Sequence, residues 1–128
     1  MTTPRRCHVV VIEDSADIRE ALQEVLTDEG YSVSVASNGL EGYKLLSAIR
    51  RPCLILLDWV MPVVDGREFL VRLRADPTLA ALPVLVLTAC TIDPAPQGVQ
   101  GLLYKPMDLD VLLAAIDRHC PAVDAFIP

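Results

Sequence analysis

The sequence predicts an α/β fold in which one parallel β-sheet lies between two layers of helices. Short apolar segments, rich in β-branched residues, alternate along the chain with segments whose apolar residues recur at helical spacing. Alternation of this kind implies right-handed crossovers, which place helices on both faces of a central parallel sheet. The chain has 128 residues, of which 52% are hydrophobic, so it fits one domain with a sizeable core.

The first half of the chain contains two strand–helix units. Residues 7–12 form an apolar run that is typical of a strand covered on both faces. A helix should follow it, with Ser15 as the N-cap and Gly30 as the stop signal. Residues 31–36 alternate as a half-exposed strand does, and a turn at Asn38 then leads into a second helix.

The second half of the chain continues this alternation. Residues 53–57 form another buried strand, which ends at Asp58. A third helix is expected around Phe69, and residues 84–87 repeat the strand pattern after Pro83. No internal repeat or linker interrupts these elements.

The segment 89–100 breaks the pattern, because it holds Pro94 and Pro96. A proline inside a helix costs about 3 kcal/mol, so no normal helix should form there. A short strand at residues 102–104 and a last helix with apolar positions between residues 109 and 116 complete the fold.

Polar residues follow four of the five predicted strands at the point where each strand ends. They are Glu13, Asp14, Asp58, Thr88 and Lys105. Because ligand sites in open α/β sheets lie at the carboxyl ends of the strands, these side chains should converge on one crevice. Each residue alone fits an ordinary role, such as a helix N-cap, a loop acid or a surface charge. Their occurrence at successive strand ends favours a common site.

The three carboxylates of this group indicate a site for a divalent cation. At separations of about 4 to 6 Å and an effective dielectric constant near 20, each pair repels by a few kcal/mol. A divalent cation relieves this repulsion, and oxygen-only ligands favour Mg²⁺, which carboxylates and phosphoryl groups commonly share. The sequence therefore predicts Mg²⁺ as the cofactor of the crevice.

Composition and charge exclude several kinds of partner. The formal net charge of -6 argues against direct binding of nucleic acid, which requires clustered Lys and Arg. No apolar stretch reaches the roughly 18 residues of a membrane span, and the amino terminus lacks the apolar segment of a signal peptide. The four cysteines, at positions 7, 53, 90 and 120, lack the spacing of a zinc site or a secreted scaffold. We therefore expect reduced thiols in a cytoplasmic protein.

Four segments of the sequence resemble, in order, the signature segments of two-component response-regulator receiver domains. They read VVVIEDS, LILLDWVMPVVDG, VLVLTA and LLYKP. The spacing is also similar, because Asp58 lies 44 positions after Asp14 and Thr88 lies 30 positions after Asp58. The resemblance implies a flavodoxin-like, doubly wound sheet of five parallel strands in the order 2-1-3-4-5. It implies a single receiver domain over residues 1–128, with residues 121–128 as a tail or linker remnant.

By this resemblance, Asp58 is the phosphoacceptor of a signalling switch. It would take a phosphoryl group from a sensor histidine kinase, a histidine phosphotransfer protein or a small acyl phosphate. The residues Glu13, Asp14 and Asp58, with the main-chain carbonyl of Val60, would hold Mg²⁺. The chain would not be an ordinary enzyme, since it would catalyse only its own phosphorylation and dephosphorylation.

Two further residues have roles that the resemblance implies. Lys105 would pair with Asp58 and then neutralise a phosphoryl oxygen, and the Thr88 hydroxyl would hydrogen-bond another. Output would pass through contacts with an unidentified protein partner, without direct contact to nucleic acid or membrane.

The sequence departs from the family in the region that usually carries output. Sixteen residues lie between Thr88 and Lys105, more than a helical turn fewer than is usual, so the fourth helix of the fold should be truncated or missing. Leu102 stands where an aromatic switch residue is usual, and Tyr104 is the nearest replacement. These departures leave an alternative function, a receiver-like interaction module that binds its partner without phosphorylation.

Two other functions of similar folds are disfavoured. An aspartyl phosphatase would carry a second acid two residues after its nucleophile, where this chain has Val60. A flavin carrier would need a hydroxyl-rich or glycine-rich loop after the first strand, whereas Glu13 and Asp14 repel phosphate unless a metal is present.

Overall fold

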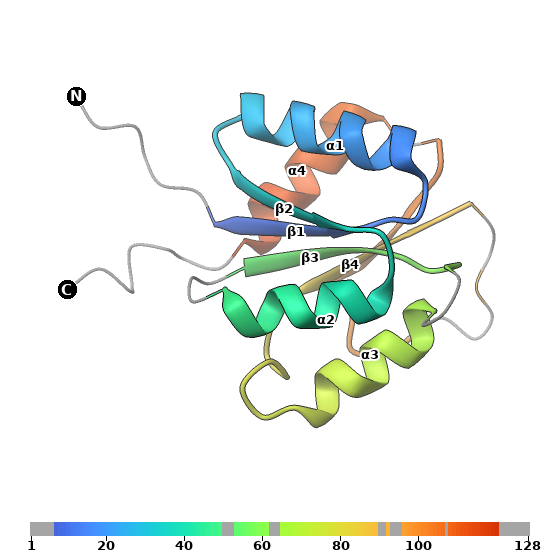
Figure 1. Ribbon diagram of the computed structural model, residues 1–128. Helices are drawn as coiled ribbons and strands as arrows, with labels where there is room; N and C mark the ends of the chain where they lie inside the picture. Colours follow the sequence, from blue (N-terminus) through green and yellow to red (C-terminus); the bar gives the residue numbers. More distant parts are fainter. Residues whose placement is uncertain are drawn as a thin grey trace.

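Five parallel strands form one sheet in the order β2-β1-β3-β4-β5, with a layer of helices on each face (Figure 1). The computed structural model describes residues 7–49, 53–61, 65–89, 92, 96–106 and 108–120. The elements in chain order are β1 (His8–Ile12), α1 (Ala16–Asp28), β2 (Ser32–Ala36), α2 (Gly39–Ala48), β3 (Cys53–Asp58), α3 (Gly66–Ala75), β4 (Val84–Thr88), β5 (Gly101–Tyr104) and α4 (Leu109–His119). The predicted fold class and strand order are therefore confirmed.

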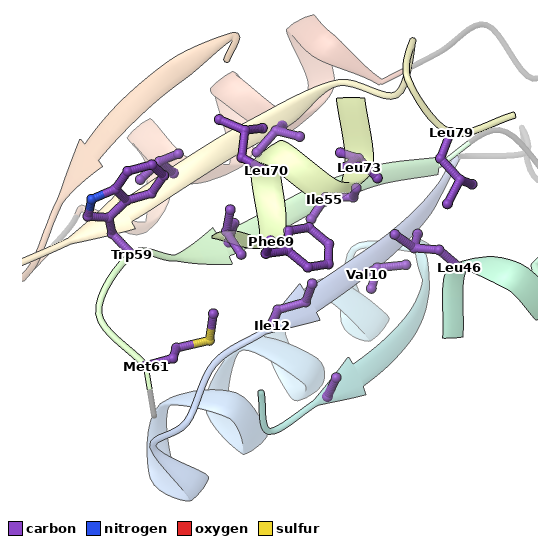
Figure 2. Close-up of a cluster of buried hydrophobic side chains, with 14 residues drawn as sticks. Val10, Ile12, Leu46, Ile55, Trp59, Met61, Phe69, Leu70, Leu73 and Leu79 are labelled. Atoms are coloured by element: carbon purple, nitrogen blue, oxygen red, sulfur yellow. The ribbon is translucent and has the colours of Figure 1, made fainter. Parts of the chain in front are cut away.

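Side-chain alternation along the central strands divides the core between the two faces of the sheet. Val10 and Ile12 of β1 pack with Phe69 of α3 in the core beneath α2 and α3 (Figure 2). Val9 and Val11 pack on the other face, which α1 and α4 cover (Figure 1). Because both faces are covered, the central strands are apolar at nearly every position, as the sequence pattern predicts.

The register of the parallel strands brings their carboxyl ends to one edge of the sheet. Ile12, the last residue of β1, pairs with Leu57, so Asp58 lies level with the loop that follows β1. Asp58 in turn pairs with Leu87, the residue before Thr88. Residues far apart in sequence thus reach the same edge through the register alone.

Helix caps fix the segments that lead away from this edge. Ser15 is the N-cap of α1 and accepts a hydrogen bond from the Ile18 amide. Asn38 and Asp65 cap α2 and α3 in the same way. The predicted stop signal of α1 is Gly30, whose φ of 94° is a left-handed conformation that glycine adopts without strain. The cap predicted at Ser15 is confirmed, and the turn predicted at Asn38 leads into α2 with Asn38 as its N-cap.

The connection from β4 to β5 contains no helix in the parts that the structure describes, residues 89, 92 and 96–100. Arg74, near the end of α3, links this connection to the one before β4, because it donates hydrogen bonds to the carbonyl of Gly98 and to those of Ala80 and Leu82. The predicted loss of the usual fourth helix is therefore confirmed, and α4 is the helix predicted last in the sequence. Pro94 lies outside the described residues.

One expectation about the cysteines is wrong. Cys7 and Cys120 are joined by a disulfide, although both were expected to be reduced thiols. The spacing rules that guided the expectation concern cysteines close in sequence, whereas these two meet only because β1 and α4 pack together. The side chains of Cys53 and Cys90 lie outside the described parts of the chain.

Across the described ranges, no helix is both long enough and apolar enough to span a membrane.

The close approach of α3 to the end of β3 gives a prediction for Gly66. A Cβ atom there would lie 2.8 Å from the Trp59 Cα and 3.0 Å from its carbonyl oxygen, so the backbone has to shift. Gly66→Ala should lower the free energy of unfolding by about 1 to 3 kcal/mol and change Trp59 fluorescence, as measured in urea titrations. Val71→Ala, at a position 65% exposed on the same helix, is the control and should cost far less. Equal effects of the two substitutions would contradict the proposed close packing.

Candidate functional site

The five polar residues predicted to converge all lie at the carboxyl edge of the sheet. Main-chain hydrogen bonds continue the strand pairing beyond the strand ends and hold the loops that carry them. The Glu13 amide donates to the Ala36 carbonyl at 3.0 Å, and the Lys105 amide donates to the Thr88 carbonyl at 2.8 Å. The structure therefore brings the predicted residues to one place.

Three carboxylates form a cluster at this edge. Glu13, Asp14 and Asp58 each offer an oxygen, and these atoms lie within 4.8 Å of one another. Glu13 is 1% exposed and Asp58 is 4% exposed, whereas Asp14 is exposed. Two buried acids beside a third at the surface form an oxygen-only donor set that opens to solvent on one side. This donor chemistry fits Mg²⁺, which accepts carboxylate oxygens and keeps several of its waters.

Lys105 is the cation of this cluster in the described parts of the chain. Its Nζ lies 2.7 Å from Glu13 Oε1 and 3.4 Å from Asp58 Oδ1. The sequence predicted Asp58 as the partner, and the structure adds Glu13 as the closer one. A carboxylate as buried as that of Glu13 requires a charged or hydrogen-bonding partner, and Lys105 meets this need.

The crowding of charge shifts the pKa values of the cluster in opposite directions. Burial, followed by hydrogen bonding with Glu13 and Asp14, raises the pKa of Asp58 to about 7. Hydrogen bonding with Asp58 is the main cause that lowers the pKa of Asp14. Burial alone would lower the pKa of Lys105, but its hydrogen bond with Glu13 and the nearby charge of Asp58 raise it. Without a further cation, Asp58 therefore holds a proton more readily than an ordinary aspartate.

Two residues that the sequence analysis did not assign to the site hold its acidic loop. The Ser15 amide donates to Glu13 Oε2 at 3.2 Å, in addition to the capping role of its side chain. Arg19 Nη1 donates to the Glu13 carbonyl at 2.9 Å. The position of Arg19, one turn into a helix that starts directly after the acids, is the sequence signal that could have identified it.

The residues around the phosphoacceptor candidate differ sharply in exposure. Thr88 is 1% exposed, whereas Val60, two residues after Asp58, is 64% exposed. Trp59 lies between Asp58 and Val60 in sequence and is buried in the core beside Leu70 (Figure 2). The Arg67 guanidinium lies over the Trp59 ring, 5.2 Å from its centroid. The site is therefore packed against the core around Asp58 and Thr88 and open to solvent beside Val60.

Leu102 and Tyr104 occupy the fifth strand as the sequence predicts, but in different surroundings. Leu102 packs against the core that contains Val86, whereas Tyr104 is 51% exposed.

Comparisons with known proteins agree with this geometry. The sequence matches the response regulator receiver domain family over residues 9–117. A probable transcriptional regulator, ycf29, of Porphyra purpurea is 36% identical over 114 residues, which cover 85% of this chain and 54% of that protein. The chain spans about half the length of that relative and of several others.

Two solved structures are similar over most of the chain. The chemotaxis protein CheY4 of Vibrio cholerae has a TM-score of 0.81 and 30% identity, with 89% of this chain and 98% of that chain covered. The response regulator TrrA of Thermotoga maritima, in complex with Mg²⁺ and BeF, has a TM-score of 0.77 and 26% identity, with 88% and 97% covered. Sequence, fold and acidic cluster agree, and the chain belongs to the response regulator receiver domain family of two-component signalling systems.

Proposed function

We propose that this chain is a phosphorylation-dependent signalling switch whose phosphoacceptor is Asp58. The donor is a sensor histidine kinase or a histidine phosphotransfer protein, and the output is a change in protein–protein contacts. The observation that carries the proposal is the position of a buried aspartate within 4.8 Å of two other carboxylates and 3.4 Å from a lysine. We place this activity in one receiver domain of a cytoplasmic protein.

In the proposed reaction, an Asp58 carboxylate oxygen attacks the phosphorus atom of the donor. The new bond is an acyl phosphate, and the bond between phosphorus and the donor breaks, so the donor leaves with the electron pair. Little covalent chemistry remains for the protein, and catalysis depends on positioning and charge neutralisation. Asp58 is held for this attack by the main-chain hydrogen bond from Trp59 to the Leu87 carbonyl.

Lys105 and Thr88 act on the transferred group. The Lys105 ammonium already lies between Glu13 and Asp58, so a small movement brings it to a phosphoryl oxygen. The Thr88 hydroxyl, at the end of β4, donates a hydrogen bond to another oxygen. Both groups stabilise the negative phosphoryl oxygens, which the carboxylates alone would repel.

The metal ligands in this proposal are Glu13, Asp14, Asp58 and the main-chain carbonyl of Val60. When bound, Mg²⁺ would neutralise the negative charge of the carboxylates and of the phosphoryl oxygens, which is more charge than Lys105 alone can neutralise. The related TrrA structure, described as a complex with Mg²⁺ and BeF, supports Mg²⁺ as the cation of the site. The raised pKa of Asp58 supports it as well, because the cluster lacks positive charge.

The first prediction concerns phosphorylation itself. Incubation with acetyl phosphate and Mg²⁺ should add one phosphoryl group, measured by intact mass, and Asp58→Asn should abolish the addition. Omission of Mg²⁺ should reduce the modified fraction by roughly 100-fold or more, because several kcal/mol of charge repulsion return. Asp28→Asn, which removes an exposed acid at the end of α1, is the control and should leave the addition unchanged. Persistent modification of the Asp58→Asn variant would refute the site.

The second prediction concerns stability and pH without Mg²⁺. Asp58 holds its proton up to about pH 7 in the folded protein, but ionises near its ordinary pKa of 3.8 in the unfolded chain. The folded state binds more protons in that window, so this group's contribution to stability is lost as pH rises from about 4 to about 7. Asp58→Asn should therefore unfold about 3 to 10 °C above the wild type at pH 8, measured by calorimetry.

The same comparison includes its control. The advantage of Asp58→Asn should disappear near pH 4, where the wild-type carboxyl is protonated. Glu20→Gln, which removes an exposed acid of α1, should show no such advantage at pH 8. A wild type more stable than Asp58→Asn at pH 8 would argue against the electrostatic strain.

The third prediction concerns output. In receiver domains a helix between the fourth and fifth strands usually helps to form a dimer surface. The described part of the β4–β5 connection contains no helix, so phosphorylation should not produce a dimer through this connection and β5. Sedimentation velocity should give a monomer mass for both the phosphorylated and the unphosphorylated chain. A phosphate-dependent dimer whose interface maps to β5 would contradict this, whereas partner binding that is equal in both states would favour the phosphorylation-independent module.

A further inference from the structure

A disulfide joins Cys7, directly before β1, to Cys120, directly after α4. Their Cα atoms are 5.8 Å apart, a separation typical of disulfides, although 113 positions separate them in sequence. The start of β1 and the end of α4 lie at the same end of the molecule (Figure 1). The bond thus closes a loop that contains nearly the whole fold.

The two sulfur atoms lie in different surroundings. Cys7 is 1% exposed and belongs to the core cluster that contains Val9 and Ile116. Cys120 is partly exposed and packs against the edge of the same cluster. Its amide donates to the Ile116 carbonyl at 2.9 Å, so it is the last residue held by α4. The disulfide therefore attaches the end of α4 to the first strand.

We infer that Cys7 and Cys120 form a reversible redox site that fastens α4 to the sheet. The oxidant is a disulfide, either a small molecule such as glutathione disulfide or a protein disulfide. The thiolate of Cys120, the more exposed of the two residues, attacks one sulfur of the oxidant and releases one thiol. The Cys7 thiolate then attacks the Cys120 sulfur of the mixed disulfide and releases the second. The two protons lost by the cysteines are carried by the two released thiols.

This site is separate from the acidic cluster. Cys7 precedes β1 and Glu13 follows it, so the five residues of the strand, at about 3.3 Å each, keep the two sites apart. Oxidation acts on the attachment of α4, whose outer face exposes Leu109 and Val111. It leaves the geometry around Asp58 unchanged. The redox site therefore does not depend on the function proposed for that residue.

Thiol trapping and mass analysis test the pairing. The oxidised protein is unfolded in the presence of an alkylating reagent, digested without reductant and mapped. We expect a peptide that links Cys7 to Cys120, with Cys53 and Cys90 alkylated. Alkylation of all four cysteines after exposure to glutathione disulfide, or a different pairing, would overturn the inference. After reduction of the folded protein, addition of glutathione disulfide should restore the same link, and failure to restore it would overturn reversibility.

Thermal unfolding tests whether the disulfide holds α4 against the sheet. Because the bond closes a long loop, reduction should lower the unfolding midpoint on the order of 10 °C. Cys120→Ser, at the partly exposed end of the bond, should unfold near the reduced wild type and should not respond to reductant. Cys90→Ser is the matched control and should keep the full response. If reduction leaves the unfolding midpoint of the wild type unchanged, the disulfide does not stabilise the attachment of α4, and the inference is wrong.

Phosphorylation by acetyl phosphate, measured at 20 °C or another temperature well below both midpoints, separates this inference from the proposed function. Oxidised and reduced protein should be modified to the same extent. A difference between them would show that the bond acts on the acidic cluster, against the inference. An absence of modification in both forms would count against Asp58 alone, because the redox measurements do not involve that residue.

Discussion

Three carboxylates share one lysine at the carboxyl edge of the sheet, and the surrounding structure keeps them close in spite of their repulsion. Lys105 lies nearer to Glu13 than to Asp58, and the pKa of Asp58 rises to about 7. The cluster is therefore short of positive charge. This shortage favours binding of a divalent cation. It also means that main-chain and cap hydrogen bonds are needed to hold the loops that carry the carboxylates.

The parallel sheet is what imposes this crowding. Apolar strands buried on both faces have a fixed register, and that register sets Glu13 level with Asp58 and places Thr88 one residue further along β4. Ser15 and Arg19 add hydrogen bonds to the loop that carries the acids. The free energy gained by burying the apolar side chains of the sheet and helices thus offsets the repulsion between the carboxylates. Binding of a cation together with a phosphoryl group can then relieve this repulsion.

Sequence reasoning was most effective where local chemistry decides the structure. Uninterrupted apolar strands and capping residues predict the elements, and polar residues at strand ends predict the members of the cluster. It was least effective where the answer depends on packing between distant segments. The preference of Lys105 for Glu13, the hydrogen bond from Arg19 and the disulfide between Cys7 and Cys120 all depend on how loops and helices meet after folding. Proline content nevertheless predicted the missing helix between β4 and β5, because proline acts on its own backbone.

The claim that the cluster lacks one cation is tested most directly by Mg²⁺ binding to the unphosphorylated protein. Trp59, the only tryptophan, follows Asp58 and is buried beside it, so its fluorescence should report occupancy of the site. We predict a saturable change in Trp59 fluorescence at millimolar or lower Mg²⁺. The Mg²⁺ affinity should be on the order of 10-fold weaker at pH 6 than at pH 8, because a proton competes for Asp58. We also predict loss of the change in Asp14→Ala. An unchanged spectrum in the wild type, or identical titrations of the wild type and Asp14→Ala, would contradict the claim.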